Sequence, residues 1–234
     1  MSWSYTFDLY INKMIRKLNT EIAEFIGMHC GDGTLYKTGW GSVWELRGSL
    51  SEKEYYIKSV VPLLNLIFNI KFFPKFRSGG KNGCFGIQTS KKEVTNFLFG
   101  FGFNLGKKTH NLKIPNYIRN SQKNMQRAFI KGLFDTDGCL YLEKIKKYKY
   151  YPRIEFGFAS KYLVDDLRVL LKNIGLHSTT WISKSYRNLK LCTTYKIRVC
   201  GNKNVKKFFE KVKPNNPKHL NKYKFYNKYS AAIA

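Results

Sequence analysis

Two Asp-Gly pairs offer the clearest chemistry in this 234-residue chain, and each closes a similar segment. The segments are FIGMHCGDGTL at 25–35, which contains Asp32, and IKGLFDTDGCL at 130–140, which contains Asp137. One Asp-Gly pair alone is a common hairpin turn, but a repeat at this long a period indicates a duplicated domain. Two carboxylates, one from each half, would present the hard oxygen ligands that suit Mg²⁺.

Apolar residues at helical spacing precede both pairs. They are Ile22, Phe25, Ile26 and Cys30 in the first half, and Phe129, Leu133 and Phe134 in the second. This spacing predicts two helices whose last turns hold Asp32 and Asp137, with Gly33 and Gly138 just beyond. The helix dipole disfavours a carboxylate there by about 0.3–1 kcal/mol. A bound divalent cation would offset that penalty.

Small residues four positions apart lie on both predicted helices, Gly27 with Gly31 and Gly132 with Thr136. Such pairs let two helices approach closely. We expect the helices to pack against each other, so that the two aspartates emerge side by side. Two carboxylates sharing metals suit in-line phosphodiester hydrolysis. The alternative is ordinary helix packing with solvated aspartates.

The elements around each motif follow the same order, which is helix, two strands, helix, two strands, helix. In the first half, SVWELRGSL alternates as a strand, the helix of 51–68 begins at Ser51 as N-cap, and 71–90 reads as a hairpin. The segment 107–122 is the expected linker. The predicted fold class is α+β with two αββαββα repeats, at 1–117 and 118–234.

The charge of the chain is strongly basic, with 42 Lys and Arg against 15 Asp and Glu, a formal net charge of +27. Nucleic acid is the usual partner of such a chain. A membrane is disfavoured because the basic residues are dispersed and no apolar run approaches the roughly 18 residues of a span. Five scattered cysteines without a CxxC pair indicate reduced thiols. We expect an intracellular protein, cytoplasmic or organellar and not secreted.

The polar faces of the predicted strands carry mostly basic and amide side chains, which reach phosphates and base edges in a major groove. The candidate DNA-binding residues are Glu45, Arg47, Lys71, Lys75, Arg77, Gln88, Ser90, Arg153, Glu155, Lys184, Lys196 and Arg198. The alternative is a merely solvated sheet face.

The two motifs resemble the LAGLIDADG signature of homing endonucleases. The first matches at Gly27, Asp32 and Gly33, and the second at Gly132, Leu133, Asp135, Asp137 and Gly138. The resemblance implies a monomeric, two-repeat protein with four-stranded antiparallel sheets that form a saddle over duplex DNA. It implies cleavage of both strands, leaving short 3′ overhangs, with Mg²⁺ as cofactor. Mn²⁺ would substitute, and Ca²⁺ would support binding without cleavage.

By this resemblance Asp32 and Asp137 are the catalytic metal-binding carboxylates, and the metal site includes Gly31 and Thr136, which precede them. Asp135 ranks second because it is not at the metal position, and Cys30 replaces the acidic residue at the matching place in the first motif.

Basic residues near the metals match the family more loosely. Lys107, Lys108 and Lys218 follow the last helices of the repeats and are candidates to stabilise charge on the phosphate. Ser51 and Ser160 lie at matching strand-to-helix junctions, where N-capping is favoured over holding water or phosphate.

The expected function is therefore site-specific double-strand DNA cleavage at a long, pseudo-palindromic or asymmetric target, by an intron-encoded monomer. Two alternatives remain open. One is an RNA maturase that binds its host intron RNA and assists splicing. The other is a DNA-binding regulator that does not cut.

Overall fold

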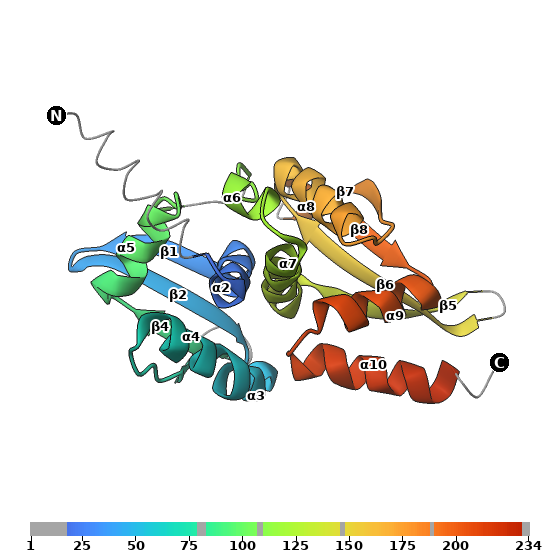
Figure 1. The fold of residues 1–234 in the computed structure, drawn as a ribbon, viewed down its shortest axis with the longest axis horizontal. Coiled ribbons are helices and arrows are strands. Elements are labelled where there is room, and N and C mark those ends of the chain that lie inside the picture. The colour runs from blue at the N-terminus through green and yellow to red at the C-terminus, as the bar shows by residue number, and fades with distance from the viewer. Residues whose placement is uncertain (1–17, 79–82, 107–109, 146–147, 188–189, 231–234) are drawn as a thin grey trace.

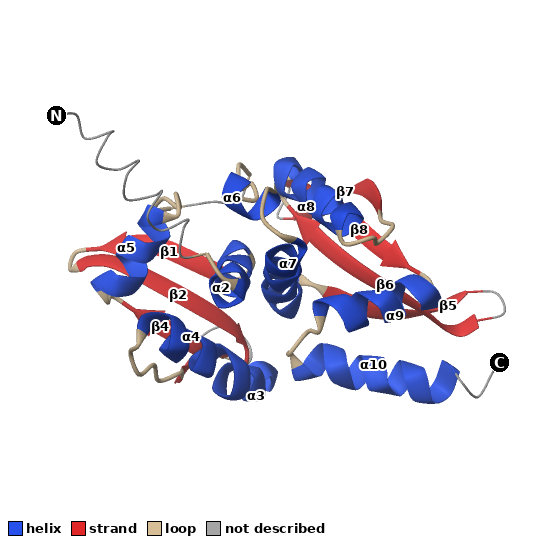
Figure 2. Cartoon of the chain, viewed as in Figure 1, coloured by secondary structure: helices blue, strands red, loops and turns tan. Residues whose placement is uncertain are grey.

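Two four-stranded antiparallel sheets, one from each half of the chain, form the framework of the protein (Figures 1 and 2). The computed structural model describes residues 18–78, 83–106, 110–145, 148–187 and 190–230. The strand order is β1-β2-β4-β3 in the first sheet and β5-β6-β8-β7 in the second. The same order in both halves confirms the duplicated α+β fold.

The strands follow the pattern predicted from the sequence. In the first sheet they are β1 (Gly33–Thr38), β2 (Gly41–Ser49), β3 (Lys75–Arg77) and β4 (Cys84–Thr89). In the second they are β5 (Cys139–Ile145), β6 (Tyr148–Phe158), β7 (Thr179–Arg187) and β8 (Lys190–Cys200).

Helices cover one face of each sheet, and two of them, α2 (Thr20–Cys30) and α7 (Lys123–Asp137), lie side by side at the centre of the molecule (Figure 1). Further helices are α3 (Lys53–Tyr55), α4 (Val61–Phe68), α5 (Lys92–Gly100), α6 (Asn116–Arg119), α8 (Lys161–Asn173), α9 (Asn202–Val212) and α10 (Pro217–Ser230). A 3₁₀ turn at Leu50–Glu52 leads into α3, and a π-helical turn at Tyr56–Val60 joins α3 to α4.

The first-repeat helix begins differently from the prediction. Ser49 is its N-cap and forms a capping box with Glu52, whereas Ser51 lies inside the 3₁₀ turn, so the expectation of Ser51 as N-cap was wrong. The reason is that the capping box needs an acidic side chain three residues after the cap, and Glu52 stands in that relation to Ser49. In the second repeat Ser160 caps α8, as predicted, and its hydroxyl accepts a hydrogen bond from the Leu163 N–H.

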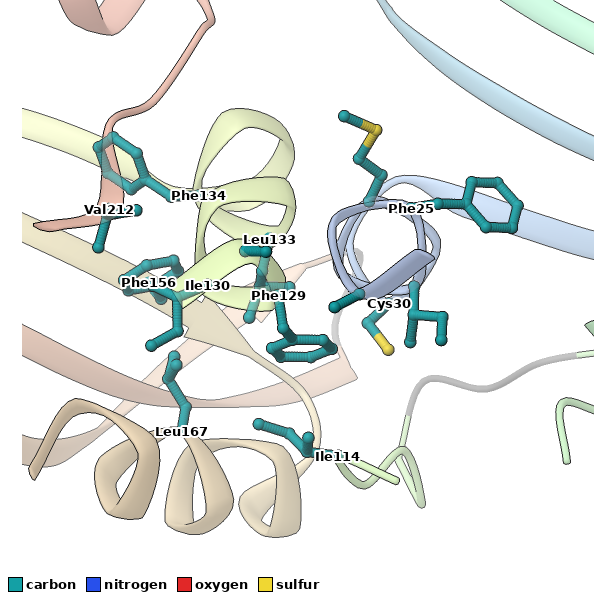
Figure 3. Packing of buried hydrophobic residues seen from close by; sticks show 14 of the residues in the cluster. Phe25, Cys30, Ile114, Phe129, Ile130, Leu133, Phe134, Phe156, Leu167 and Val212 are labelled. Carbon is teal, nitrogen blue, oxygen red and sulfur yellow. The ribbon is translucent and has the colours of Figure 1, made fainter. Parts of the chain in front are cut away.

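Close packing of α2 against α7 joins the two repeats (Figure 3). A β-carbon at Gly27 would lie 2.1 Å from the carbonyl oxygen of Phe129, and one at Gly132 would lie 2.0 Å from that of Glu24. The prediction that these small residues allow close approach is confirmed. Beside the glycines, Lys131 Nζ lies 2.9 Å from Glu24 Oε2, an ion pair that also joins the repeats.

A single apolar cluster extends from this interface under both sheets. In the second repeat, Phe134 of α7 packs edge-on against Phe156 of β6 and Phe208 of α9. In the first, Phe25 of α2 packs against Trp44 of β2. The motif helices are therefore the shared centre of the core.

In the part of the chain that the structure describes, two helices lie outside the predicted pattern. The short helix α6 falls in the expected linker and spans the predicted boundary between residues 117 and 118. Helix α10 runs along β5 and β6 and is fixed by Tyr223, whose ring stacks on Phe209 at 3.8 Å. Its segment PKHLNKYKFYNKYS has aromatic rings and lysines where an amphipathic helix has aliphatic residues, so apolar spacing did not reveal it.

Among the described residues, no helix has the combined length and apolar character needed to cross a membrane. The five cysteines are thiols, as predicted.

Candidate functional site

The two motif aspartates lie at the same ends of the paired helices. Asp137 is the last residue of α7 and is exposed. Helix α2 ends earlier, at Cys30, with Gly31 as its cap, so Asp32 lies in the turn that leads to β1 and is half-buried. The prediction of a last-turn position is confirmed for Asp137 and wrong by two residues for Asp32.

The motif ends meet at Gly31. A β-carbon there would lie 2.1 Å from the Thr136 hydroxyl oxygen and 3.4 Å from Asp137 Oδ2. The Asp137 carboxylate therefore lies against the residue that directly precedes Asp32. This contact brings the two acidic residues to one place between the repeats.

The glycines that follow the aspartates are required by space and not by a left-handed backbone. Gly138 has φ −79° and ψ 159°, which is extended. A β-carbon on it would lie 2.1 Å from Cδ2 of Phe134, and one on Gly33 would lie 2.5 Å from Cα of His29. These two positions exclude side chains because each chain turns back against its own helix.

The donor set at the helix ends fits a hard divalent cation that completes its shell with water and phosphate. Mg²⁺ commonly takes one or two protein carboxylates and keeps several waters, and Asp32 and Asp137 supply two. Within the described part of the chain no group of three or more His, Cys, Asp or Glu side chains is placed to hold a metal. The Thr136 hydroxyl donates to the carbonyls of Gly132 and Leu133 at 3.0 and 3.1 Å. That hydroxyl is therefore engaged. The Thr136 carbonyl oxygen accepts from the Lys218 ammonium at 3.4 Å, so the second lone pair of this carbonyl is what Thr136 retains for a cation.

Lys218 lies beside this centre, at the start of α10. Its ammonium is 2.8 Å from Glu52 Oε1 and 3.4 Å from the carbonyl oxygen of Thr136. The structure thus places one of the three predicted lysines next to the second motif. Lys107 and Lys108 lie outside the described residues.

Glu52 is a residue that sequence reasoning missed. It is 8% exposed, and its carboxylate also accepts hydrogen bonds from the Ser49 N–H at 2.9 Å and the Asn216 side-chain amide at 2.8 Å. Its capping role was readable from the Ser49–Glu52 spacing. Its contact with the second repeat carried no sequence signal, because more than a hundred residues separate the partners.

Asp135 is fully buried and holds the segment between α9 and α10. Its carboxylate accepts the N–H of Asn215 at 2.9 Å and the N–H of Asn216 at 3.0 Å. Burial raises the pKa of Asp135 to about 7, although these hydrogen bonds act in the opposite direction. Asp135 therefore points away from the site shared by the other two aspartates and anchors a turn.

The predicted polar residues of the first sheet share the face opposite the core. Glu45 pairs with Gln88 and Arg47 with Gly86 across β2 and β4. Arg77 donates to Gln88 at 2.8 Å, and Arg47 forms an ion pair with Glu45 at 2.7 Å. Lys75 lies on the same face, whereas Lys71 and Ser90 lie just outside the strands and are exposed.

The second sheet presents a similar face. Glu155 accepts from Lys196 at 2.8 Å and from Arg198 at 3.0 Å, and Arg153 lies two residues before it on the same side of β6. Trp181 was missed. The Arg198 guanidinium lies 4.1 Å from the centre of the Trp181 ring. The available signal was the alternation of side chains along β7, which places Trp181 on the same face as Lys196.

Lys184 was placed on the wrong face. The β7–β8 register runs without a shift from Thr179 to Arg187, with Trp181 opposite Lys196 and Lys184 opposite Thr193. Since side chains alternate along a strand, Lys184 points to the face opposite Trp181 and Lys196.

Comparisons with known proteins agree with this architecture. Residues 124–213 match the family model of the LAGLIDADG-like domain. An uncharacterized protein of Methanocaldococcus jannaschii is 30% identical over 198 residues, which are 83% of this chain and 21% of that protein. A probable translation initiation factor IF-2 of the same organism is 35% identical over 124 residues, 52% of this chain and 10% of the factor. The chain thus spans about a fifth or less of the length of these relatives.

Among solved structures, the homing endonuclease I-DmoI in complex with DNA and Mn is similar, with a TM-score of 0.57 and 19% identity over 82% of this chain and 96% of that chain. The N-terminal LAGLIDADG domain of DUF199/WhiA has a TM-score of 0.51 and 14% identity over 88% of this chain and 89% of that chain. At these identities the likeness shows the fold. Residues 124–213 therefore form a LAGLIDADG-like domain, and the chain as a whole has the two-repeat fold of I-DmoI.

Proposed function

We propose that this protein is a site-specific, metal-dependent double-strand DNA endonuclease. The observation that carries the proposal is the meeting of Asp32 and Asp137 at the ends of two glycine-packed helices, where the Asp137 carboxylate lies against Gly31. Two sheets with basic and amide faces flank this centre. The solved complex of I-DmoI with DNA and Mn supports the same assignment.

In this proposal the residues have three roles, which are metal binding, stabilisation of charge on the phosphate, and DNA binding. Asp32, Asp137 and the carbonyls of Gly31 and Thr136 would hold divalent cations such as Mg²⁺. The cation would lower the pKa of the attacking water and stabilise charge on the leaving oxygen. Lys218 supplies a positive charge toward the phosphate. The sheet faces, through residues such as Arg77 and Arg198, bind the duplex and fix its register.

The different names of the relatives support the view that this chain corresponds to a mobile segment. Proteins with unrelated names match this chain over a tenth to a fifth of their length, which is the pattern of a segment present in different hosts. We propose the same origin here. The flanking genomic sequence distinguishes an intron-encoded enzyme from a segment embedded in a host protein, and its fused flanks give the candidate DNA target.

The test is Asp137→Asn, assayed for cleavage of that target with Mg²⁺ and for duplex binding with Ca²⁺. We expect cleavage to fall by about 10²-fold or more, an order of magnitude typical for loss of transition-state charge stabilisation, with binding retained. Asp32→Asn should behave in the same way. Asp165→Asn on the exposed surface of α8 is the matched control.

Normal cutting by Asp137→Asn would contradict the site assignment. A wild-type protein that binds duplex but never nicks it with Mg²⁺ or Mn²⁺ would favour a non-cutting regulator. Tighter binding of intron RNA than of duplex DNA, together with restored splicing, would favour the maturase.

A further inference from the structure

The turn that precedes α10 is attached to both repeats. Asp135 of the second motif accepts the N–H of Asn215 and the N–H of Asn216. The side-chain amide of Asn216 donates to the carbonyl of Asp135 and to Glu52 Oε1, at 2.8 Å each. Asn216 is fully buried, so these hydrogen bonds are shielded from water. The turn is therefore fixed to the end of α7 and, through Glu52, to the first repeat.

Glu52 is itself held rigidly. Its Oε2 accepts the Ser49 N–H of the capping box at 2.9 Å, which leaves Oε1 for Asn216 and Lys218. A β-carbon at Gly48 would lie 2.6 Å from Oε2, so the neighbouring backbone closes the space on that side. The Glu52 carboxylate is therefore fixed by hydrogen bonds at both of its oxygens.

We propose that Asp135, Glu52 and Asn216 are positioning residues that hold the Lys218 ammonium at the Asp137 half of the cleavage centre. The inference rests on the proposed nuclease function. Lys218 Nζ lies between Glu52 Oε1 and the carbonyl of Thr136, the residue before Asp137. From that position the ammonium reaches a phosphate bound at Asp137 with its charge already oriented.

The two motifs differ at the residue that anchors this turn. Asp135 is the sixth residue of the second motif, and the buried thiol of Cys30 stands in the same place in the first. A thiol is a weak hydrogen-bond partner, so a carboxylate-anchored turn belongs to the second motif. Weakening the network should slow cutting of one DNA strand more than the other.

The experiment compares Glu52→Gln, Asp135→Asn and Lys218→Met on a duplex labelled separately on each strand, in single-turnover reactions. We expect Lys218→Met to slow one strand by about 10²-fold, as for loss of one charge-stabilising donor. The two positioning variants should slow the same strand by about 10-fold, because misplacement affects the group without removing it. Nicked duplex should accumulate, and affinity for the duplex in EDTA should stay within about twofold of wild type.

Double variants separate positioning from a general structural effect. Adding Glu52→Gln to Lys218→Met should slow cleavage no further, since residues that act through one group are not additive. Lys161→Met is the matched control, because it removes a lysine from an exposed ion pair, that with Asp165 on α8, without touching Lys218. It should leave the ratio of the two strand rates unchanged.

A readout independent of cleavage is the rate of acylation of Lys218, followed by peptide mass spectrometry. The rate should rise in Glu52→Gln and Asp135→Asn and stay unchanged in Lys161→Met. Unchanged acylation in both positioning variants, or equal slowing of both strands, overturns the inference. If wild type does not cut DNA but acylation changes as expected, the proposed function fails while the placement of Lys218 stands.

Discussion

The missing side chains of Gly27 and Gly132 determine how closely the two motif helices approach. Each close approach is to a backbone carbonyl of the partner helix, and backbone cannot rotate away as a side chain can. The carbonyls involved also accept hydrogen bonds within their own helices. The separation of the repeats, and with it the distance between the two aspartates, therefore depends on hydrogen atoms at these positions.

We expect Gly27→Ala to lower the free energy of unfolding by about 1–3 kcal/mol or more, the range for an overpacked core. Urea denaturation followed by circular dichroism measures the change. Gly39→Ala is the control, since a β-carbon there meets nothing within 4 Å. Equal stability of Gly27→Ala and Gly39→Ala would show that the helices can separate freely.

His219 gives the protein a sensitivity to acid. The ring is 2% exposed and lies 4.2 Å from that of Phe134, and burial lowers the pKa of His219 to about 3. In the unfolded chain the pKa is about 6.5, so the unfolded state binds the proton first. The stability due to neutral His219 is complete above about pH 6.5 and declines as the pH falls toward 3.

The variant His219→Leu removes this titration. Relative to the variant, wild type should lose on the order of 2–3 kcal/mol of unfolding free energy between about pH 7 and about pH 4.5. The measurement is urea denaturation of both proteins across that range. Subtracting one profile from the other cancels the other buried groups, including Asp135, and parallel profiles would contradict the assignment.

At the scale of elements, α10 extends the basic surface beyond the sheets. It has lysines at 218, 222, 224 and 228 and no acidic residue. Lys222 lies 6.0 Å from the ring centre of Tyr141, on the polar face of β5, so the helix adjoins the proposed DNA-binding face. On this geometry α10 adds phosphate contacts outside the saddle.

Replacing Lys222, Lys224 and Lys228 with Gln should weaken binding of every duplex alike. The slope of log K against log salt should flatten by about 0.9 for each phosphate that the helix no longer neutralises. Fluorescence anisotropy at several salt concentrations measures both effects. The control is Lys172→Gln with Lys206→Gln, on the helices of the opposite side. An equal weakening in the control would mean that overall charge, and not α10, is responsible.

The helices and strands also show which structural features could be predicted from the sequence. Strand alternation and helical spacing identified both sheets and the helices of both repeats, because burial on one face imposes those periods. The face of Lys184 was misassigned because the face that each side chain takes depends on the residue at which the strand begins. The sequence of β7 does not define that residue. Helix α10 escaped notice because tyrosines stack there in place of aliphatic packing.

At the scale of the molecule, the duplication predicted the meeting of the two aspartates better than any single residue did. Asp32 and Asp137 were found because two weak motifs coincide with small-residue pairs. Glu52 was not, because its partners Asn216 and Lys218 lie in the other repeat. Contacts between segments that are distant in the chain impose no periodic pattern on the residues, so they cannot be predicted from a single sequence.

Each repeat also holds the chain segment on the far side of the interface. Asn216 and Lys218, which follow the last helix of the second αββαββα unit, bind Glu52 of the first. Conversely, Leu112 and Ile114, which follow the first unit, bind Ser160 and Asp166 of the second. A chimera built by exchanging one half for that of a relative would disrupt both of these sets of hydrogen bonds at once. Recombination between such genes should therefore yield folded proteins only when the crossover also exchanges the residues that form these hydrogen bonds.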